Sequence, residues 1–231
     1  MLVDGAATRA LEALREAVWP TRCVGCDEPG ELLCAACRER MPWVAQRWAC
    51  PVCGSPFGWL TCTACERDWE LRVVCACSFE GTVRRLPSLL KDEHELRLAP
   101  VMAAAIATAL DEAGCAGGCD GVCFVPATAA AYVRRGFDHM ELVARPLARM
   151  LGLPLADVLA RGPAADQRAL GREGRSANLA GTVRALEDVS GLRLLLVDDV
   201  VTTGASMRAC AAALRERGAA EVVGCAMARV W

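Results

Sequence analysis

The sequence predicts an α/β protein in which a parallel sheet follows a small cysteine-rich module. From about Cys75 the chain alternates between short apolar runs and helical patterns, as expected of a sheet with crossover helices. Before that point, eight cysteines form four successive C-x-x-C pairs. A third observation is the apolar run 194–197, which two acids and a Thr-Thr-Gly turn follow. That order is typical of a buried parallel strand that ends at a ligand site.

The composition limits the classes of protein that the chain can represent. Its 231 residues suit one domain of ordinary size plus a small module. A net charge of −2 excludes a globally basic nucleic-acid binder, although a local basic patch stays possible. Charged residues interrupt every apolar run, so no membrane insertion is expected. The N-terminus does not have the pattern of a signal peptide, and we therefore expect a cytoplasmic protein.

Three parts are expected along the chain. Residues 1–20 have apolar positions interleaved with Glu12 and Arg15, which indicates an amphipathic helix. Residues 21–70 contain the paired cysteines, and residues 71–231 form the α/β domain.

The four C-x-x-C pairs indicate metal binding. Each pair has the spacing of a metal knuckle, and eight thiolates make two tetrahedral four-cysteine zinc sites. Disulfides are the competing interpretation, which the lack of a secretory signal disfavours. Sharing of ions between consecutive pairs closes shorter loops than a cross-brace and is favoured, but the sequence leaves both open. The expected ligands are Cys23, Cys26, Cys34, Cys37, Cys50, Cys53, Cys62 and Cys65.

Four tryptophans are interleaved with these pairs. We expect them to cover the small metal cores, with stacking on nucleic-acid bases as the alternative. They are Trp43, Trp48, Trp59 and Trp69.

The elements of the α/β domain follow from apolar periodicity and from helix start signals. Pro87 and Pro100 each stand near the beginning of a helical stretch. The expected elements are a strand at 72–79, two helical pieces within 83–110, a strand at 121–126, a helix from about 136 to 150, a weak strand at 183–186, a strong strand at 192–197, a helix at 206–217 and a last strand at 221–227.

The segment after the strong strand suggests a site for a ribose phosphate. Asp198 and Asp199 suit sugar hydroxyls or a metal ion. The following loop, 202–206, is small and rich in hydroxyls, and it enters a helix, so its backbone N–H groups can face an anion. One loop that holds a phosphate beside a diol describes a ribose 5-phosphate site.

Basic residues elsewhere fit the same ligand. Arg134 and Arg135 precede Gly136 and suit a polyphosphate, with a solvated basic loop as the alternative. Lys91 is the sole lysine, which indicates either a need for a compact ammonium or a drift of composition toward Arg. The polar segment 166–178 is expected to be a loop over a site or a docking surface.

The segment 197–206 resembles the phosphoribosyl pyrophosphate (PRPP) motif of type I phosphoribosyltransferases. Most of the chain is similar to the ComF family, including its GntX-like members, which has a double zinc ribbon before such a domain. The matching positions are Leu90-Lys91, Val125-Pro126, Arg135-Gly136-Phe137, and Gln167, Leu170, Arg175 and Asn178. Two positions depart from the family: Asp138-His139 stands where Asn-Gln is common, and Ala164 where Thr is common.

The resemblance implies a function and a set of roles. Asp198 and Asp199 would face the ribose, and Lys91 and Arg135 would neutralise pyrophosphate charge, as the catalytic groups of a pentosyltransferase. The cofactors would be two structural zinc ions and Mg²⁺ with PRPP. The residues implied to bind PRPP are Val197, Asp198, Asp199, Val200, Val201, Thr202, Thr203, Gly204, Ala205, Ser206, Arg134 and Gly136.

The family association with competence and natural transformation implies a second hypothesis of function. In it the chain is a non-catalytic adapter that binds single-stranded DNA or a competence helicase, and PRPP is a ligand or is absent. The acceptor substrate, the oligomeric state and the occurrence of catalysis stay open at this point.

Overall fold

The computed structural model describes residues 16, 20–65, 69–115, 117–162 and 183–231. Most of the expected N-terminal helix and all of the segment 166–178 lie outside these residues, as does Ala164. The chain divides into two compact units, 1–41 and 42–231. This division falls between the two halves of the expected module 21–70, and the predicted domain boundaries stay a prediction.

The first unit is built around its cysteines. Its one helix among the described elements is α2 (Ala35–Glu39), and Arg22 pairs with Pro29 in an isolated antiparallel bridge. The backbone N–H of Cys23 donates to the carbonyl of Glu28, which closes the first knuckle.

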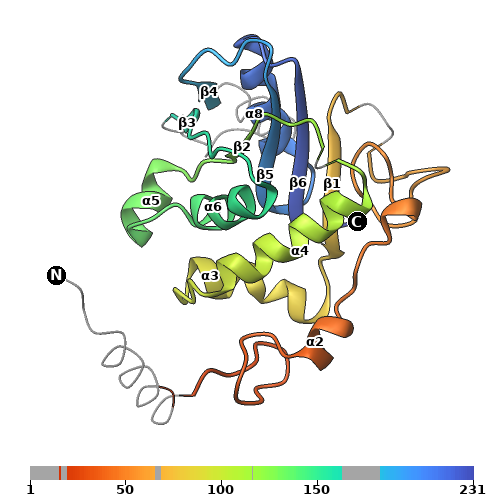
Figure 1. Ribbon diagram of the computed structural model, residues 1–231, viewed down its shortest axis with the longest axis vertical. Coiled ribbons are helices and arrows are strands. Elements are labelled where there is room, and N and C mark those ends of the chain that lie inside the picture. Colours follow the sequence, from red (N-terminus) through yellow and green to blue (C-terminus); the bar gives the residue numbers. More distant parts are fainter. Residues whose placement is uncertain (1–15, 17–19, 66–68, 116, 163–182) are drawn as a thin grey trace, which may run out of the picture. The chain divides into compact units, whose positions relative to one another are not determined.

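The second unit contains a four-stranded parallel sheet in the order β1-β6-β5-β2 (Figure 1). Its strands are β1 (Arg72–Ser78), β2 (Gly121–Phe124), β5 (Arg193–Val201) and β6 (Glu221–Arg229). A parallel bridge between Val122 and Leu155 extends the sheet beyond β2. All four strands confirm the predicted ones. The strongest of them, β5, continues through the two acids to Val201 instead of ending at Val197.

Helices cover both faces of this sheet. In Figure 1, α4 (Leu98–Glu112) and α6 (His139–Leu151) lie in front of the strands, and α8 (Ala205–Glu216) lies behind them. The short helix α3 (Leu86–Lys91) precedes α4 and has Pro87 in its first turn, as expected. Two short 3-10 helices are also present, η1 (Gln46–Trp48) and η2 (Gly81–Arg84).

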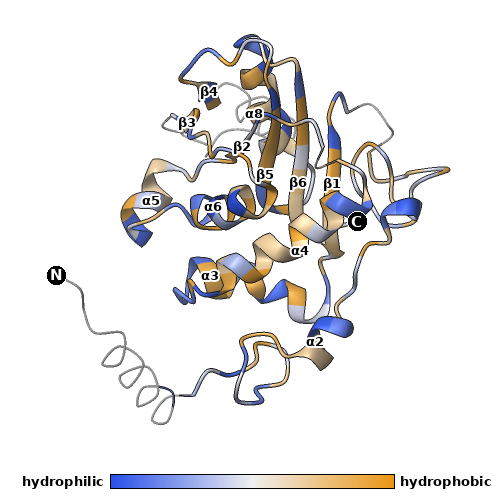
Figure 2. Cartoon of the chain, viewed as in Figure 1, coloured by the Kyte–Doolittle hydropathy of each residue, from blue (hydrophilic) through white to orange (hydrophobic). Residues whose placement is uncertain are grey.

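The core follows the alternation of side chains along the strands. Val73 and Cys75 of β1 and Leu194 and Leu196 of β5 belong to one buried cluster with the inner face of α8. The intervening apolar positions face α4 and α6. Figure 2 shows the hydrophobic colouring continuing along β1, β5 and β6, as expected of a parallel sheet buried on both faces.

Two short elements differ from the sequence prediction. Residues 183–185 do form a strand, β4 (Val183–Ala185), but it pairs antiparallel with the unpredicted β3 (Leu159–Arg161) in a separate two-stranded sheet. A helix, α5 (Ala129–Arg135), precedes Gly136, where the sequence suggested only a basic turn. The side chain of Thr128 caps α5, and Gly136 ends it at a φ of 80°.

Candidate functional site

A cavity of about 270 Å³ lies at the carboxyl ends of the parallel strands, where ligands bind in open α/β sheets. It gathers side chains from the ends of β2 and β5, from α3, α5 and α6, and from the two-stranded sheet. The lining residues are Lys91, Val125, Pro126, Ala127, Thr128, Ala131, Arg135, His139, Arg161, Asp198, Asp199, Val200 and Ser206.

The two acids enter this cavity from opposite faces of the sheet. Because β5 continues through them, their side chains alternate. Asp198 shares the α8 face with Leu194 and Leu196, whereas Asp199 faces α3 and α6. The acids therefore approach a ligand from two sides of the strand end.

Asp199 forms an ion pair with Lys91, the last residue of α3. Burial alone would raise the pKa of this carboxyl, but the Lys91 ammonium outweighs burial and holds the pKa below its usual range. The sole lysine of the chain therefore neutralises one of the two acids.

Asp198 has the opposite electrostatic environment. Burial and the neighbouring Asp199 charge raise the pKa of Asp198 well above its ordinary value. The two adjacent acids therefore differ in their environments, which favour the negative charge on Asp199 over Asp198.

His139 lies beside this ion pair. Its Nδ1 is 3.4 Å from Nη1 of Arg135, and its side chain is buried. Burial, followed by the charge of Lys91, lowers the pKa of His139 from 6.5 to about 4. The imidazole is therefore neutral at pH 7.

The loop after β5 has the properties of an anion site. Among the described residues, the backbone N–H groups of Thr202, Thr203 and Gly204 have no acceptor. Gly204 is the N-cap of α8 and offers no side chain to cap the helix. The positive end of a twelve-residue helix therefore lies beside Ser206 and the cavity.

Two guanidinium groups complete the cavity. Arg135 ends α5, and its Nη2 lies 3.9 Å from Asp92. Arg161 extends from β3, and its Nε and Nη2 are buried without a hydrogen-bond partner in the described part of the chain. Such an unpaired buried guanidinium indicates a site for a negatively charged group.

Six predicted residues of the phosphoribosyl site meet at the cavity: Lys91, Arg135, Asp198, Asp199, Val200 and Ser206. Others lie around it. Arg134 is exposed and does not line the cavity, and Gly136 serves as the end of α5. Val197 and Val201 are buried in the sheet.

His139 and Arg161 are site residues that the sequence analysis did not assign. Their signal is weak, because one was noted only as a departure from the family and the other stands in a three-residue strand. Asp138, the other departure, has a structural role. Its carboxylate accepts hydrogen bonds from the backbone N–H groups of Ala127 (2.6 Å) and Met140 (2.8 Å), and so joins the end of β2 to the start of α6.

The cysteines form two groups of four, as consecutive sharing predicts. They are Cys23, Cys26, Cys34 and Cys37, and Cys50, Cys53, Cys62 and Cys65, with the sulfurs of each group within 4.8 Å of one another. A tetrahedral zinc with Zn–S bonds of about 2.3 Å places its sulfurs about 3.8 Å apart.

The measured sulfur separations agree with zinc and not with disulfides. Cys26 and Cys34 are 3.7 Å apart, and Cys50 and Cys65 are 3.8 Å apart. A disulfide would need about 2.05 Å. The donor sets therefore fit two structural zinc ions.

The four tryptophans do not share one environment. Trp43, Trp48 and Trp59 are between 40% and 46% exposed, whereas Trp69 is buried. Trp69 belongs to the same core cluster as Cys50, Cys53 and Cys65. Cover of a metal core thus fits Trp69 better than the other three.

None of the described helices has the length and apolar character that a membrane crossing requires.

Comparisons with known proteins agree with these features. The model of the phosphoribosyl transferase domain matches residues 141–229, and the model of the double zinc ribbon domain matches residues 14–66. The chain is thus a zinc-ribbon protein with a phosphoribosyltransferase domain.

Its relatives define the family. The DNA utilization protein YhgH of Salmonella typhi is 31% identical over 201 residues, which cover 82% of this chain and 87% of the relative. The YhgH protein of Escherichia coli K12 is 28% identical over 200 residues, with the same shares. The chain belongs to the ComF family.

Solved structures with similar folds are more distant. The glutamine PRPP amidotransferase of B. subtilis gives a TM-score of 0.39 at 23% identity, over 57% of this chain and 26% of the other. The match therefore spans about a quarter of that protein. The purine phosphoribosyltransferase of Pyrococcus horikoshii gives 0.36 at 19% identity, over 57% of this chain and 73% of the other.

Proposed function

We propose that this protein binds PRPP together with Mg²⁺ at the cavity beyond β5. The observation that carries the proposal is the meeting of two acids, an uncapped helix N-terminus and three basic side chains in one cavity. PRPP offers a partner for each of these groups, because it has a ribose diol, a 5-phosphate and a pyrophosphate.

The roles follow from the positions of the groups. The N–H groups of 202–204 and the start of α8 hold the 5-phosphate, because they have no other acceptor. Asp198 and Asp199 face the ribose hydroxyls from the two sides of the strand end. When bound, Mg²⁺ would offset the negative charge of the pyrophosphate and of Asp198 and Asp199. Lys91 and Arg135 add positive charge on the α3 and α5 side of the cavity.

If a nucleophile attacks C1 of the ribose, the C1–O bond to pyrophosphate breaks and pyrophosphate leaves with the electron pair. The basic groups then stabilise a charge that develops on the leaving group, for which one preorganised donor typically contributes about 3 kcal/mol. We place this protein among the pentosyltransferases on these grounds and leave the acceptor open.

Titration calorimetry tests PRPP binding. Zinc-loaded protein is titrated with PRPP in the presence and absence of Mg²⁺, and the Asp198→Asn/Asp199→Asn protein serves as the control. We expect Mg²⁺-dependent binding that the double substitution weakens at least tenfold. Absence of binding to zinc-loaded wild type would refute the proposal. A pyrophosphate-release assay with a panel of bases then separates an enzyme from a ligand sensor.

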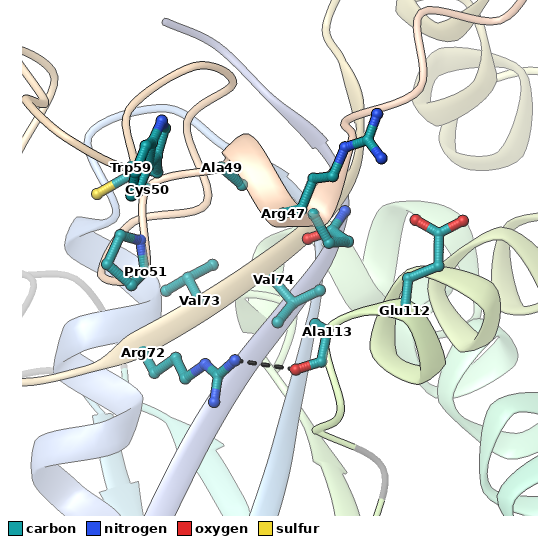
Figure 3. A pocket seen from close by; sticks show the side chains of 11 residues that line it. Arg47, Ala49, Cys50, Pro51, Trp59, Arg72, Val73, Val74, Glu112 and Ala113 are labelled. Atoms are coloured by element: carbon teal, nitrogen blue, oxygen red, sulfur yellow. Dashed lines mark hydrogen bonds between the residues drawn. The ribbon is translucent and has the colours of Figure 1, made fainter.

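A second candidate function is favoured by an aromatic surface near the second cysteine group. The rings of Trp48 and Trp59 lie 5.7 Å apart, and the guanidinium of Arg47 lies 5.4 Å from the Trp48 ring centre. Figure 3 shows Trp59, Arg47 and Arg72 among the residues around a neighbouring cavity of about 340 Å³, which Glu112 also lines. Exposed rings beside guanidinium groups suit the bases and phosphates of single-stranded DNA.

The curated relatives are named as DNA utilization proteins, which supports this second function as an adapter role. Anisotropy of a labelled single-stranded oligonucleotide, measured at several salt concentrations, distinguishes the two candidates. Binding that Trp48→Ala/Trp59→Ala removes and that Asp198→Asn/Asp199→Asn retains would assign DNA to the aromatic surface. No binding at low salt would exclude this function.

A further inference from the structure

The loop 202–206, called the phosphate loop from its proposed role, passes directly over the ring of Trp69. A Cβ placed on Gly204 would lie 2.6 Å from Cζ3 and 2.8 Å from Cζ2 of Trp69, and closer still to Cη2. Gly204 also has a φ of 71°, which side chains rarely adopt. The ring and the loop backbone therefore contact each other with no side chain between them.

Arg229 joins the same ring to the beginning of the loop. Its guanidinium lies 5.6 Å from the Trp69 ring centre, and its Nη1 donates to the carbonyl of Val201 at 3.0 Å and to the carbonyl of Thr202. Arg229 is 1% exposed, so these hydrogen bonds are shielded from water. Arg208 lies 5.2 Å from the same ring centre.

These contacts determine which way the loop N–H groups point. In a planar trans peptide the C=O and the following N–H point in opposite directions. Because the carbonyls of Val201 and Thr202 face Arg229, the N–H groups of Thr202 and Thr203 point away from it. Trp69 and Arg229 thus hold the loop with its donors free for an anion.

Trp69 shares a buried cluster with the second cysteine group. Trp69 is four residues beyond Cys65 in the sequence, and both belong to one buried cluster with Cys50 and Cys53. Gly54, which follows the Cys50/Cys53 pair, packs on β1, since a Cβ there would lie 2.9 Å from the carbonyl oxygen of Val73. In the sequence Trp69 therefore stands between the cysteine group and β1, two parts of the chain that pack on each other.

We propose that the second zinc site positions the phosphate loop through Trp69. In this arrangement Trp69 is a positioning residue, because it does not line the cavity and acts on the ligand only through Gly204 and the loop. Zinc in the group Cys50, Cys53, Cys62 and Cys65 then supports anion binding, although no cysteine contacts the anion. The expected effect on PRPP affinity rests on the proposed function. The expected effect on the order of the loop does not.

The test compares Trp69→Leu with Trp43→Leu, which removes an exposed tryptophan of the same unit. Zinc content and far-UV circular dichroism establish that each variant is folded. Hydrogen exchange is measured without ligand at the amides of Arg208 and Val230, which donate to the carbonyls of Gly204 and Val201, and PRPP affinity is measured with Mg²⁺. In Trp69→Leu we expect at least tenfold faster exchange and at least tenfold weaker PRPP binding, and in Trp43→Leu neither change.

Equal loop exchange in Trp69→Leu and wild type would overturn the proposal. If Trp69→Leu does not fold, Trp69→Phe keeps part of the aromatic surface, and we expect about threefold faster exchange than in wild type; no change would again overturn the proposal. Failure of the wild type to bind PRPP would refute only the proposed function, because the exchange measurement needs no ligand.

The contribution of zinc itself is tested by removing one ligand from each group. Cys53→Ser is expected to accelerate exchange of the Arg208 and Val230 amides more than Cys26→Ser does, because Cys26 belongs to the other group and the other compact unit. An equal effect of the two substitutions would show that the second zinc site has no special relation to the loop.

Discussion

Substitution of Gly204 by alanine measures the contact between the phosphate loop and Trp69. The new methyl group would meet the ring at 2.8 Å or less on three atoms, which no real Cβ does without movement of its neighbours. Overpacking of this kind costs about 1–3 kcal/mol. The φ of 71° adds about 1–2 kcal/mol for any residue with a Cβ. We expect the free energy of unfolding to fall by about 3 kcal/mol in total.

The matched control is Gly136→Ala. Like Gly204, Gly136 stands at a helix terminus, the end of α5, and has a positive φ of 80°. A Cβ at Gly136 would meet no atom within 4 Å. Only the conformational cost of about 1–2 kcal/mol applies to it. The difference between the two variants therefore isolates the contact with Trp69.

Urea unfolding of zinc-loaded protein measures both values, and a thermal scan should show Gly204→Ala melting roughly 6–12 °C below wild type. In a Trp69→Ala background the cost of Gly204→Ala should drop to that of Gly136→Ala, because the ring is gone. If Gly204→Ala costs no more than Gly136→Ala in the wild-type background, the close contact described here is wrong.

Three further outcomes follow from the charged groups of the cavity. The pKa of His139 falls from 6.5 to about 4 on folding, so this residue contributes roughly 3 kcal/mol that is lost as pH falls through that window, and His139→Gln should flatten the corresponding slope in urea unfolding. Lys91→Met leaves the buried Asp199 carboxylate unpaired and should lower the free energy of unfolding at pH 7 by about 3 kcal/mol, with a deficit that shrinks at lower pH as the carboxyl takes up a proton. Arg161→Met should weaken PRPP binding at least tenfold in calorimetry with zinc content unchanged, and unaltered affinity would remove Arg161 from the site.

The long, strongly patterned elements of the fold were predictable from the sequence. The apolar run of β5, the amphipathic pattern of α8 and the proline at the start of α3 each gave an element of the right type. The short elements were not. β3 and β4 have three residues each, and their pairing depends on contacts between distant parts of the chain.

The candidate site was predictable where one segment contains it. Asp198, Asp199 and the loop to Ser206 are contiguous, and the order of residue types indicates their chemistry. The ion pair between Lys91 and Asp199 joins residues more than a hundred positions apart, and the pattern around Lys91 gives only its charge. Long-range pairing of this kind is decided by topology, which local patterns do not specify.

The contact of Trp69 with the phosphate loop also could not be predicted from the sequence. The spacing of Trp69 from Cys65 suggested a cover for the metal core, and its burial with that group agrees. Its contact with Gly204 joins residues more than a hundred positions apart in the sequence and depends on how distant parts of the chain pack. The proposed phosphate ligand alone explains a glycine at position 204. Nothing in the sequence therefore indicated a second reason for it.

The strand order has a consequence for how the chain acquires this fold. β1 pairs along its length with β6, which contains nearly the last residues of the chain. During synthesis both cysteine groups and β1 leave the ribosome long before that partner exists. We expect metal uptake by the cysteine groups to precede closure of the sheet. The second cysteine group is then already ordered when the apolar β1 is still unpaired. Slow, late pairing of strands that are far apart in the sequence is where aggregation competes with folding, and zinc supply during expression should therefore affect the yield of folded protein.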